Sequence, residues 1–231
     1  TLERLYKDIE IFSNTPKLNF TNQIPEFVRR YSLSKITGVW NIPSNKEIQT
    51  IIEAAGHSVK GLLVDVSNYS LYFYGQPVHI FDAKKVNWDI QIRFAKVWET
   101  ILALDDKEYE LGEKDIVIAD SEKVLAIAWI IWGKSSAVSD ETSEILVETA
   151  HFDQAVLRMT WKRLWVRTDA LNVFEKDILP EMCLKAQALV IRELQKEFPA
   201  LKVEAFGDSY SHKQEKVIQD FDLNFYSNLV W

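Results

Sequence analysis

The longest uninterrupted apolar run of the chain, Val124–Trp132, has nine residues. A helix that spans a bilayer needs about 20 such residues, so this run is too short to cross a membrane. An apolar run of this length is typical of a fully buried strand or of a buried half-helix. The run therefore predicts an element of a protein core and not a membrane segment.

Composition narrows the class of protein further. Hydrophobic residues make up 47% of the 231 residues, which is ample for a packed core and excludes a disordered chain. The single cysteine, Cys183, fits a reducing compartment, so we expect a cytoplasmic protein. The net charge of −7 disfavours a broad, non-specific contact with nucleic acid but leaves room for a local basic site. Neither G-x-G-x-x-G nor G-x-x-x-x-G-K-[ST] occurs, so dinucleotide and P-loop binding lack their main sequence support.

Helical and strand-like patterns are mixed along the chain, which predicts an α+β fold with mostly antiparallel sheets flanked by several helices. The clearest helix is expected at about residues 179–198, with a proline in its first turn and another directly after it. We expect residues 1–231 to form a single globular unit, with a possible boundary in the serine-rich stretch 134–143. Residues 1–43 carry prolines among polar clusters and are expected to form an irregular N-terminal arm with short helices.

The most distinctive local pattern lies near the C-terminus. A predicted strand at 201–206 leads into Gly207-Asp208-Ser209, and a second predicted strand, 220–226, follows. On that strand Asp220 and Asp222 would share one face, where two carboxylates can bind a common cation such as Mg²⁺. A Gly-Ser turn beside them would let backbone N–H groups of Gly207 and Ser209 approach the phosphates of a nucleotide. The alternative is that Asp220 and Asp222 form the solvated face of an amphipathic edge strand.

This order of elements resembles the signature of the polymerase β-type nucleotidyltransferase superfamily, over roughly the last fifty residues. The resemblance implies nucleotide binding and magnesium-dependent nucleotidyl transfer, with Asp220 and Asp222 as catalytic metal ligands and with Gly207 and Ser209 at the phosphates. Two features depart from the family pattern. Asp208 stands where the family usually has the serine, and no third carboxylate follows on a later strand.

A second constellation lies in the first half of the chain. Strands are predicted at Val59–Val66, Tyr69–Tyr74 and Val78–Asp82, and in a meander the ends of the first and third would be close together. Asp65, Asp82 and Lys84 would then resemble the metal site of PD-(D/E)XK nucleases, in which the acids hold Mg²⁺ and the lysine orients water. Ordinary solvent-exposed charges at strand ends are the alternative interpretation.

A third pattern interleaves basic and aromatic residues between Arg158 and Arg167. Trp161 and Trp165 alternate there with arginine and lysine, a combination that can stack on bases and contact phosphates. The same tryptophans at four-residue spacing would also suit a core, with the basic side chains at its rim. The four histidines are scattered, and none has zinc-ligand spacing to Cys183 or to another histidine.

Two classes of function follow from these patterns. The first is metal-dependent phosphoryl or nucleotidyl transfer on a nucleotide or nucleic acid, with the nuclease as its variant. The second is a non-catalytic module that binds a protein partner through an acidic surface and exposed aromatic residues.

Overall fold

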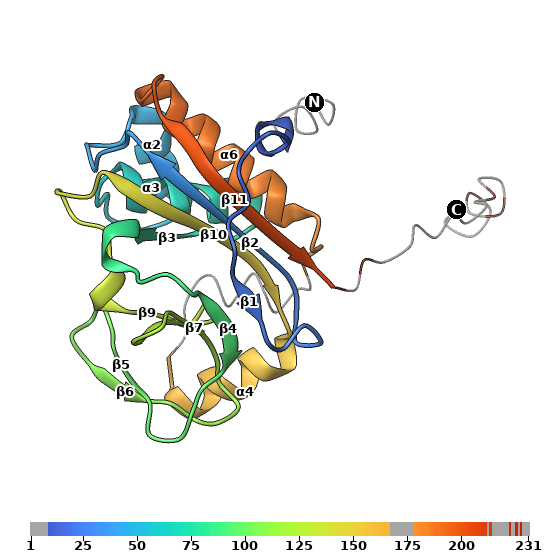
Figure 1. The fold of residues 1–231 in the computed structure, drawn as a ribbon. Coiled ribbons are helices and arrows are strands. Elements are labelled where there is room, and N and C mark those ends of the chain that lie inside the picture. Colours follow the sequence, from blue (N-terminus) through green and yellow to red (C-terminus); the bar gives the residue numbers. More distant parts are fainter. Residues whose placement is uncertain are drawn as a thin grey trace.

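The computed structural model of the protein describes residues 9–166 and 178–211, together with 213, 222, 225 and 227. Its largest feature is a four-stranded antiparallel sheet in the order β11-β2-β10-β3 (Figure 1). The strands are β2 (Val28–Thr37), β3 (His79–Asp82), β10 (Glu144–Phe152) and β11 (Lys202–Tyr210). The central pair, β2 and β10, therefore comes from segments that are more than a hundred residues apart in the chain.

A second, five-stranded sheet has the order β1-β4-β7-β8-β9 and lies against one face of the first. Its first pair is parallel and its other pairs are antiparallel. The strands are β1 (Thr21–Asn22), β4 (Gln91–Phe94), β7 (Ile116–Ala119), β8 (Val124–Ile127) and β9 (Ile131–Trp132). The apolar run 124–132 thus forms β8, a turn and β9, and the strand interpretation of that run is confirmed. A hairpin of β5 (Thr100–Leu102) and β6 (Glu108–Glu110) lies beside this sheet.

Helices cover the other face of the four-stranded sheet. These are α2 (Lys46–Ala54), α3 (Leu62–Tyr69) with a π-helical extension Ser70–Tyr74, and α6 (Met182–Glu197). Helix α4 (Gln154–Leu164) packs instead against the five-stranded side. Short 3-10 turns are found at η1 (Ile9–Phe12), η3 (Ala83–Lys85) and η4 (Lys134–Ser136).

The side chains of β10 alternate between two cores. Ile145 and Val147 pack with α6 and α3, whereas Leu146 and Ala150 pack with the five-stranded sheet. Because successive residues of a strand point to opposite faces, a strand between two packed layers must be apolar on both. This requirement explains why 145–152 contains few charged residues. A charged residue within this strand therefore needs a specific structural explanation.

The α+β class, the antiparallel sheets and the long helix near 179–198 are confirmed by the structure. The irregular arm expected at 1–43 is wrong for residues 28–37, which form the central strand β2. The strands predicted at Val59–Val66 and Tyr69–Tyr74 are also wrong, because 62–74 is helical. Leu62, Val66 and Tyr69 recur at helical spacing on one buried face, and Gly61, with φ of 139°, starts the helix.

None of the helices in the described part of the chain is both long and apolar enough to cross a membrane.

Gly207 lies inside β11, at a point where another part of the chain crosses it. A Cβ atom at this position would lie 2.3 Å from the backbone oxygen of Leu18 and 2.8 Å from the ring of Phe20. Residues 16–18 bind the edge of β11 here, since the Leu18 N–H donates to the Phe206 carbonyl (2.8 Å) and the Phe206 N–H to the Pro16 carbonyl (2.8 Å). The glycine is therefore required by close packing of two backbone segments.

We predict that Gly207→Ala lowers the free energy of unfolding by about 1–3 kcal/mol, because an extra methyl group forces these segments apart. Urea unfolding followed by circular dichroism measures this change. Lys202→Ala, at an exposed position of the same strand, is the control and should change the free energy by less than about 0.5 kcal/mol. Equal stability of Gly207→Ala and wild type would contradict the close approach.

Candidate functional site

The structure places the two carboxylates of the nuclease hypothesis in separate structural roles. Asp65 lies on α3 and is fully buried, where it accepts hydrogen bonds from the Ser44 hydroxyl (2.6 Å) and from the backbone N–H groups of Lys60 and Gly61. Its carboxylate therefore stabilises the start of the helix. Asp82 is 3% exposed and accepts from the Thr142 hydroxyl (2.7 Å) and the Lys84 N–H (3.0 Å). The nuclease hypothesis is wrong, because Asp65 lies on a helix and not at the end of a strand, and the two carboxylates bind different sets of hydroxyl and backbone N–H donors.

The C-terminal signature does not form the predicted turn. Gly207 and Ser209 are paired with Leu33 and Tyr31 in the continuous strand β11. Asp208 accepts two hydrogen bonds from the Arg30 guanidinium, at 3.0 and 2.9 Å, and a further one from the Ser32 hydroxyl. Backbone N–H groups that belong to a sheet do not form a phosphate-binding turn.

Of the two predicted metal ligands, the structure describes Asp222 only. Asp220 lies outside the described residues, so the pairing of Asp220 with Asp222 on one strand stays a prediction. Asp222 is exposed, and its carboxylate accepts from the Phe225 N–H (3.1 Å). Within the described ranges no group of three His, Cys, Asp or Glu side chains is arranged to hold a metal ion.

The basic and aromatic stretch that begins at Arg158 lies on α4 as far as Leu164. Trp161 packs partly against the core, while Trp165 at the end of the helix is 90% exposed. Arg163 forms an ion pair with Asp115 and donates to the Glu110 carbonyl (3.1 Å). Arg167 lies outside the described residues. This stretch is therefore divided between core and surface.

A pocket of about 180 Å³ lies between helix α3, strand β3 and the segment that follows β9. Its walls are mostly apolar. They include Leu63, Val64, Ile80, Leu104, Trp132 and Val138, and the polar residues Ser67, Asn68 and His79 also reach it. The pocket therefore forms where the edge of the four-stranded sheet meets the last strand of the five-stranded sheet.

His79 is the aromatic centre of this pocket. Its ring stacks on Trp132 with 5.4 Å between centroids and an interplanar angle of 11°, and it meets the Phe81 ring edge-on at 4.1 Å. Removal of the imidazole from water lowers the pKa of His79 to about 3, because the charged form loses its hydration. The imidazole is therefore neutral at physiological pH and behaves as an aromatic wall.

Glu148 lies opposite His79 in the register of β10 and β3. It is 2% exposed, and burial raises the pKa of its carboxyl group to about 8, so the group is protonated at neutral pH. The fully buried Tyr31 is close enough for the charged form of Glu148 to raise the pKa of the Tyr31 phenol further. The Tyr31 hydroxyl has no hydrogen-bond partner among the described residues.

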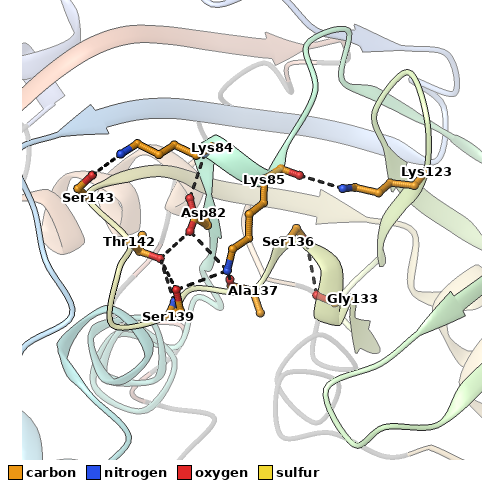
Figure 2. A network of polar contacts seen from close by, with 10 residues as sticks. All are labelled: Asp82, Lys84, Lys85, Lys123, Gly133, Ser136, Ala137, Ser139, Thr142 and Ser143. Atoms are coloured by element: carbon orange, nitrogen blue, oxygen red, sulfur yellow. Dashed lines mark hydrogen bonds and ion pairs between the residues drawn. The ribbon is translucent and has the colours of Figure 1, made fainter.

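A network of polar contacts fixes the far wall of the pocket (Figure 2). The Lys85 ammonium donates to the carbonyl of Ala137 (2.8 Å), which lines the pocket, and it lies 3.6 Å from the Asp82 carboxylate. Thr142 donates to Asp82 and accepts from the Ser139 N–H (2.9 Å). The segment 134–143, which the sequence offers as a possible domain boundary, is thus tied to β3 and η3 by hydrogen bonds. The expectation of a single globular unit stays a prediction.

Sequence patterns alone do not identify His79 and Trp132, which line this pocket, or Glu148, which lies opposite His79 in the sheet. In the sequence His79 is only one of four scattered histidines. The available signal was Glu148, a carboxylate in the middle of an apolar stretch, since glutamate is almost never fully buried without a reason. His79 and Trp132 could not be paired from the sequence, because they lie on strands of different sheets.

Comparison with known proteins places the chain in a family. The B3/4 domain family matches residues 28–198. The β subunit of phenylalanine–tRNA ligase is 38% identical in Brucella abortus over 156 residues, which is 68% of this chain and 19% of that protein. The same subunit is 38% identical in Gluconobacter oxydans, over 69% of this chain and 20% of that protein. In Carboxydothermus hydrogenoformans it is also 38% identical, over 74% of this chain and 22% of that protein.

The chain thus spans about a fifth of the length of these relatives. An N-terminal fragment of the phenylalanyl-tRNA synthetase β-subunit from Pyrococcus horikoshii aligns in structure with a TM-score of 0.42 and 16% identity. The alignment covers 66% of this chain and 50% of that one. The family match overturns the resemblance to polymerase β-type nucleotidyltransferases, and with it the predicted nucleotide-binding, magnesium-dependent transfer activity.

His79 and its cross-strand neighbour Glu148 generate a specific dependence of the protein's stability on pH. Between about pH 4.5 and 8 the folded state keeps the Glu148 proton that the unfolded state has lost, so stability should fall as pH rises towards 8. Below about pH 6.5 the unfolded state protonates His79 while the folded state does not, so stability should fall as pH falls. The two slopes oppose each other between about pH 4.5 and 6.5, and a plateau is expected there.

We predict that Glu148→Gln removes the loss of stability between about pH 6.5 and 8, because the amide does not ionise. Unfolding free energies from urea titrations across this range measure the effect. Glu144→Gln, on the same strand, retains Glu148 and should retain the alkaline loss. An unchanged alkaline slope in Glu148→Gln would show that another group causes it.

Proposed function

Because the chain belongs to the B3/4 domain family, we propose that it binds tRNA carrying an aromatic amino acid, with the amino-acid side chain in the pocket beside His79. The curated relatives are named phenylalanine–tRNA ligases, so their own ligands include phenylalanine and tRNA. Since the chain spans only a fifth of those proteins, we carry over the two ligands and not the ligation reaction. A tRNA ligand is in keeping with the predicted cytoplasmic location, which stays a prediction.

The observation that carries this proposal is the size and chemistry of the pocket. Sites for drug-sized ligands have volumes of about 300–1,000 Å³, so a pocket of about 180 Å³ suits a single side chain. Its apolar wall would bury the ring of phenylalanine, and the rings of His79 and Trp132 offer the aromatic faces and edges that such a ring prefers.

The protonation states of His79 and Glu148 favour a ligand with an uncharged side chain. At neutral pH, His79 carries no positive charge, and its cross-strand neighbour Glu148 carries no negative charge. A charged amino-acid side chain would lose its hydration in this pocket and gain no opposite charge from either residue. An aromatic side chain avoids this cost, so the pocket should discriminate by polarity as well as by size.

We predict that the protein binds phenylalanyl-tRNA roughly tenfold or more tightly than uncharged tRNA or aspartyl-tRNA, because burial of one phenylalanine side chain contributes about 1.5–3 kcal/mol. Fluorescence anisotropy with labelled tRNA measures the three affinities. Ser67→Leu, which projects a larger apolar side chain into the pocket from α3, should abolish the preference while leaving the affinity for uncharged tRNA unchanged.

Thr50→Leu is the matched control for this variant. Thr50 is exposed on α2, away from the pocket, and its hydroxyl bonds to a carbonyl of its own helix as that of Ser67 does. The control should keep the preference for phenylalanyl-tRNA. Absence of tRNA binding by the wild-type protein would overturn the proposal. Equal affinities for all three tRNAs would restrict it to tRNA binding without a role for the pocket.

A further inference from the structure

Strand β5 pairs with β6 along one edge, and the hydrogen bonds between the two strands fix which backbone groups of β5 face outward. The Glu99 carbonyl accepts from the residue directly after β6 (2.9 Å), and the Ala103 N–H donates to the residue directly before β6 (2.9 Å). In an antiparallel pair every second residue of a strand bonds to the partner strand. Because Glu99 and Ala103 face β6, Thr100 and Leu102 turn their N–H and C=O groups away from it.

These outward backbone groups are open to a ligand. Within the described ranges, the N–H and C=O groups of Thr100 and Leu102 have no hydrogen-bond partner. The same edge is occupied directly after β5, where the Leu104 N–H donates to the Trp132 carbonyl (3.2 Å). We call the outward backbone groups of Thr100 and Leu102 the open β5 edge. An edge of this kind can pair with a further strand.

The open β5 edge lines a second pocket, which has a volume of about 440 Å³. Other lining residues come from 122–124, where β8 begins, and from η4. A strand residue rises about 3.3 Å, lies about 4.8 Å from the next strand and belongs to a layer about 10 Å thick, so it occupies about 160 Å³. The pocket therefore has room for about three residues of an extended segment beside β5.

The surroundings of this pocket are acidic. Residues 96–124 contain nine Asp or Glu and four Lys, a net charge of −5 against −7 for the whole chain. Glu108 and Glu110 lie directly opposite Leu102 and Thr100 in the hairpin and are exposed, and the exposed Glu122 lines the pocket. Among the described residues, none of these three carboxylates is in an ion pair, whereas Asp105 and Asp106 are paired with lysines.

Two lysines also line the pocket. Lys134 is neutralised by its ion pair with Asp106. Lys123 donates to a backbone carbonyl (3.0 Å) and keeps its charge. Three carboxylates therefore face a single uncompensated ammonium group, and the balance of charge favours a basic ligand.

Apolar side chains are exposed on and beside the same strand. Leu102 is 49% exposed, and Trp98, two residues before β5, is 83% exposed. Neighbouring strands lie about 4.8 Å apart, so a strand that pairs with β5 would cover part of Leu102 with its own side chains. The ligand should therefore carry apolar side chains as well as basic ones.

We propose that the open β5 edge binds an extended segment of a protein partner as an added strand, and that this segment alternates basic and apolar residues. Thr100 and Leu102 supply the backbone hydrogen bonds, Leu102 supplies apolar contact, and Glu108, Glu110 and Glu122 attract the basic side chains. A second copy of this chain would bring the same carboxylates together, which opposes pairing of two β5 edges. The inference is independent of the proposed tRNA ligand, because none of the residues lining this pocket lines the pocket beside His79.

Amide hydrogen exchange, followed by NMR, tests whether the edge is open. In the free protein the N–H groups of Thr100 and Leu102 should exchange roughly tenfold or more faster than those of Ile101 and Ala103, because only the latter are bonded to β6. Equal protection of all four amides would contradict an open edge and overturn the inference.

Binding is measured by fluorescence anisotropy with a labelled peptide, acetyl-Lys-Val-Lys-Val-Lys-Val-Lys-amide. Its affinity should be roughly tenfold or more above that of the peptide with glutamate in place of lysine, because the pocket rim is acidic. The peptide with proline in place of valine keeps the charge but cannot form a strand, and it should bind weakly. Binding of the lysine–valine peptide should slow the exchange of the Thr100 and Leu102 amides.

Two variants of one residue separate backbone pairing from side-chain contact. Leu102→Pro removes an outward N–H that the hairpin does not use, and proline is tolerated at such edge positions. Leu102→Ala removes the same side chain but keeps the N–H. The lysine–valine peptide should bind Leu102→Pro several-fold more weakly than Leu102→Ala, since the proline also blocks the approach of a strand.

A charge variant keeps the test independent of changes in the backbone. Glu108→Gln/Glu110→Gln should weaken binding of the lysine–valine peptide several-fold. Glu26→Gln/Glu53→Gln removes two exposed carboxylates elsewhere and should leave the affinity unchanged. Thermal unfolding of every variant establishes that it is folded at the temperature of the assay.

The remaining outcomes would each overturn the inference. Failure of wild type to bind the lysine–valine peptide would do so, as would equal affinities for the lysine, glutamate and proline peptides. Equal affinities of Leu102→Pro and Leu102→Ala would exclude strand pairing at this edge. A dimer in analytical ultracentrifugation that Leu102→Pro abolishes would assign the edge to a second copy of the chain. All of these results leave the proposed tRNA ligand to its own test.

Discussion

Strand β10 is buried on both of its faces, and the positions of both sheets and of the pocket depend on this double burial. Ile145 and Val147 pack under the helices, while Leu146 and Ala150 pack on the five-stranded sheet. Apolar burial contributes about 25 cal/mol per Å², so a strand between two layers gains stabilisation from each. Its neighbours β2 and β3 also satisfy its backbone groups on both sides. A carboxyl group on this strand is costly unless it is neutral, and the raised pKa of Glu148 shows that it takes the neutral form.

The junction between the sheets depends on polar contacts where apolar packing ends. The chain leaves the four-stranded sheet after Asp82 and returns to it at Glu144, so the two ends of the excursion lie side by side in β3 and β10. Asp82 is buried at this point and is satisfied by Thr142, by the Lys84 N–H and by Lys85. A buried carboxylate without such partners would cost several kcal/mol. The same contacts fix the segment 133–143, and the shape of the pocket therefore follows from the closure of the sheet junction.

Much of the fold class is readable from the sequence, and little of the site is. The helix near 179–198 and the strand at Val78–Asp82 have strong local patterns, and both are found in α6 and β3. The helix at 62–74 was predicted as two strands because a short apolar run has no unique period. Its start is decided by Gly61 and by contacts of Asp65 with Ser44, twenty-one residues away. The pocket depends on contacts between strands of different sheets, which a single sequence does not specify. Gly207 suggested a phosphate-binding turn. The structure shows instead that a glycine is required there because the backbone of Leu18 crosses β11 at this position.

An acidic protein can recognise RNA because the electrostatic field in solution is local. At physiological ionic strength the screening length is about 8 Å, so a phosphate at the protein surface is influenced mainly by the charges close to it and only weakly by the net charge of −7. The net negative charge opposes sliding and non-specific contacts over the rest of the surface. Contacts with a few phosphates alone give weak binding, and substantial affinity of the proposed tRNA complex then requires filling of the pocket as well. Such a balance favours the aminoacylated end of a tRNA over its many equivalent phosphates, because only that end supplies both phosphates and a side chain for the pocket.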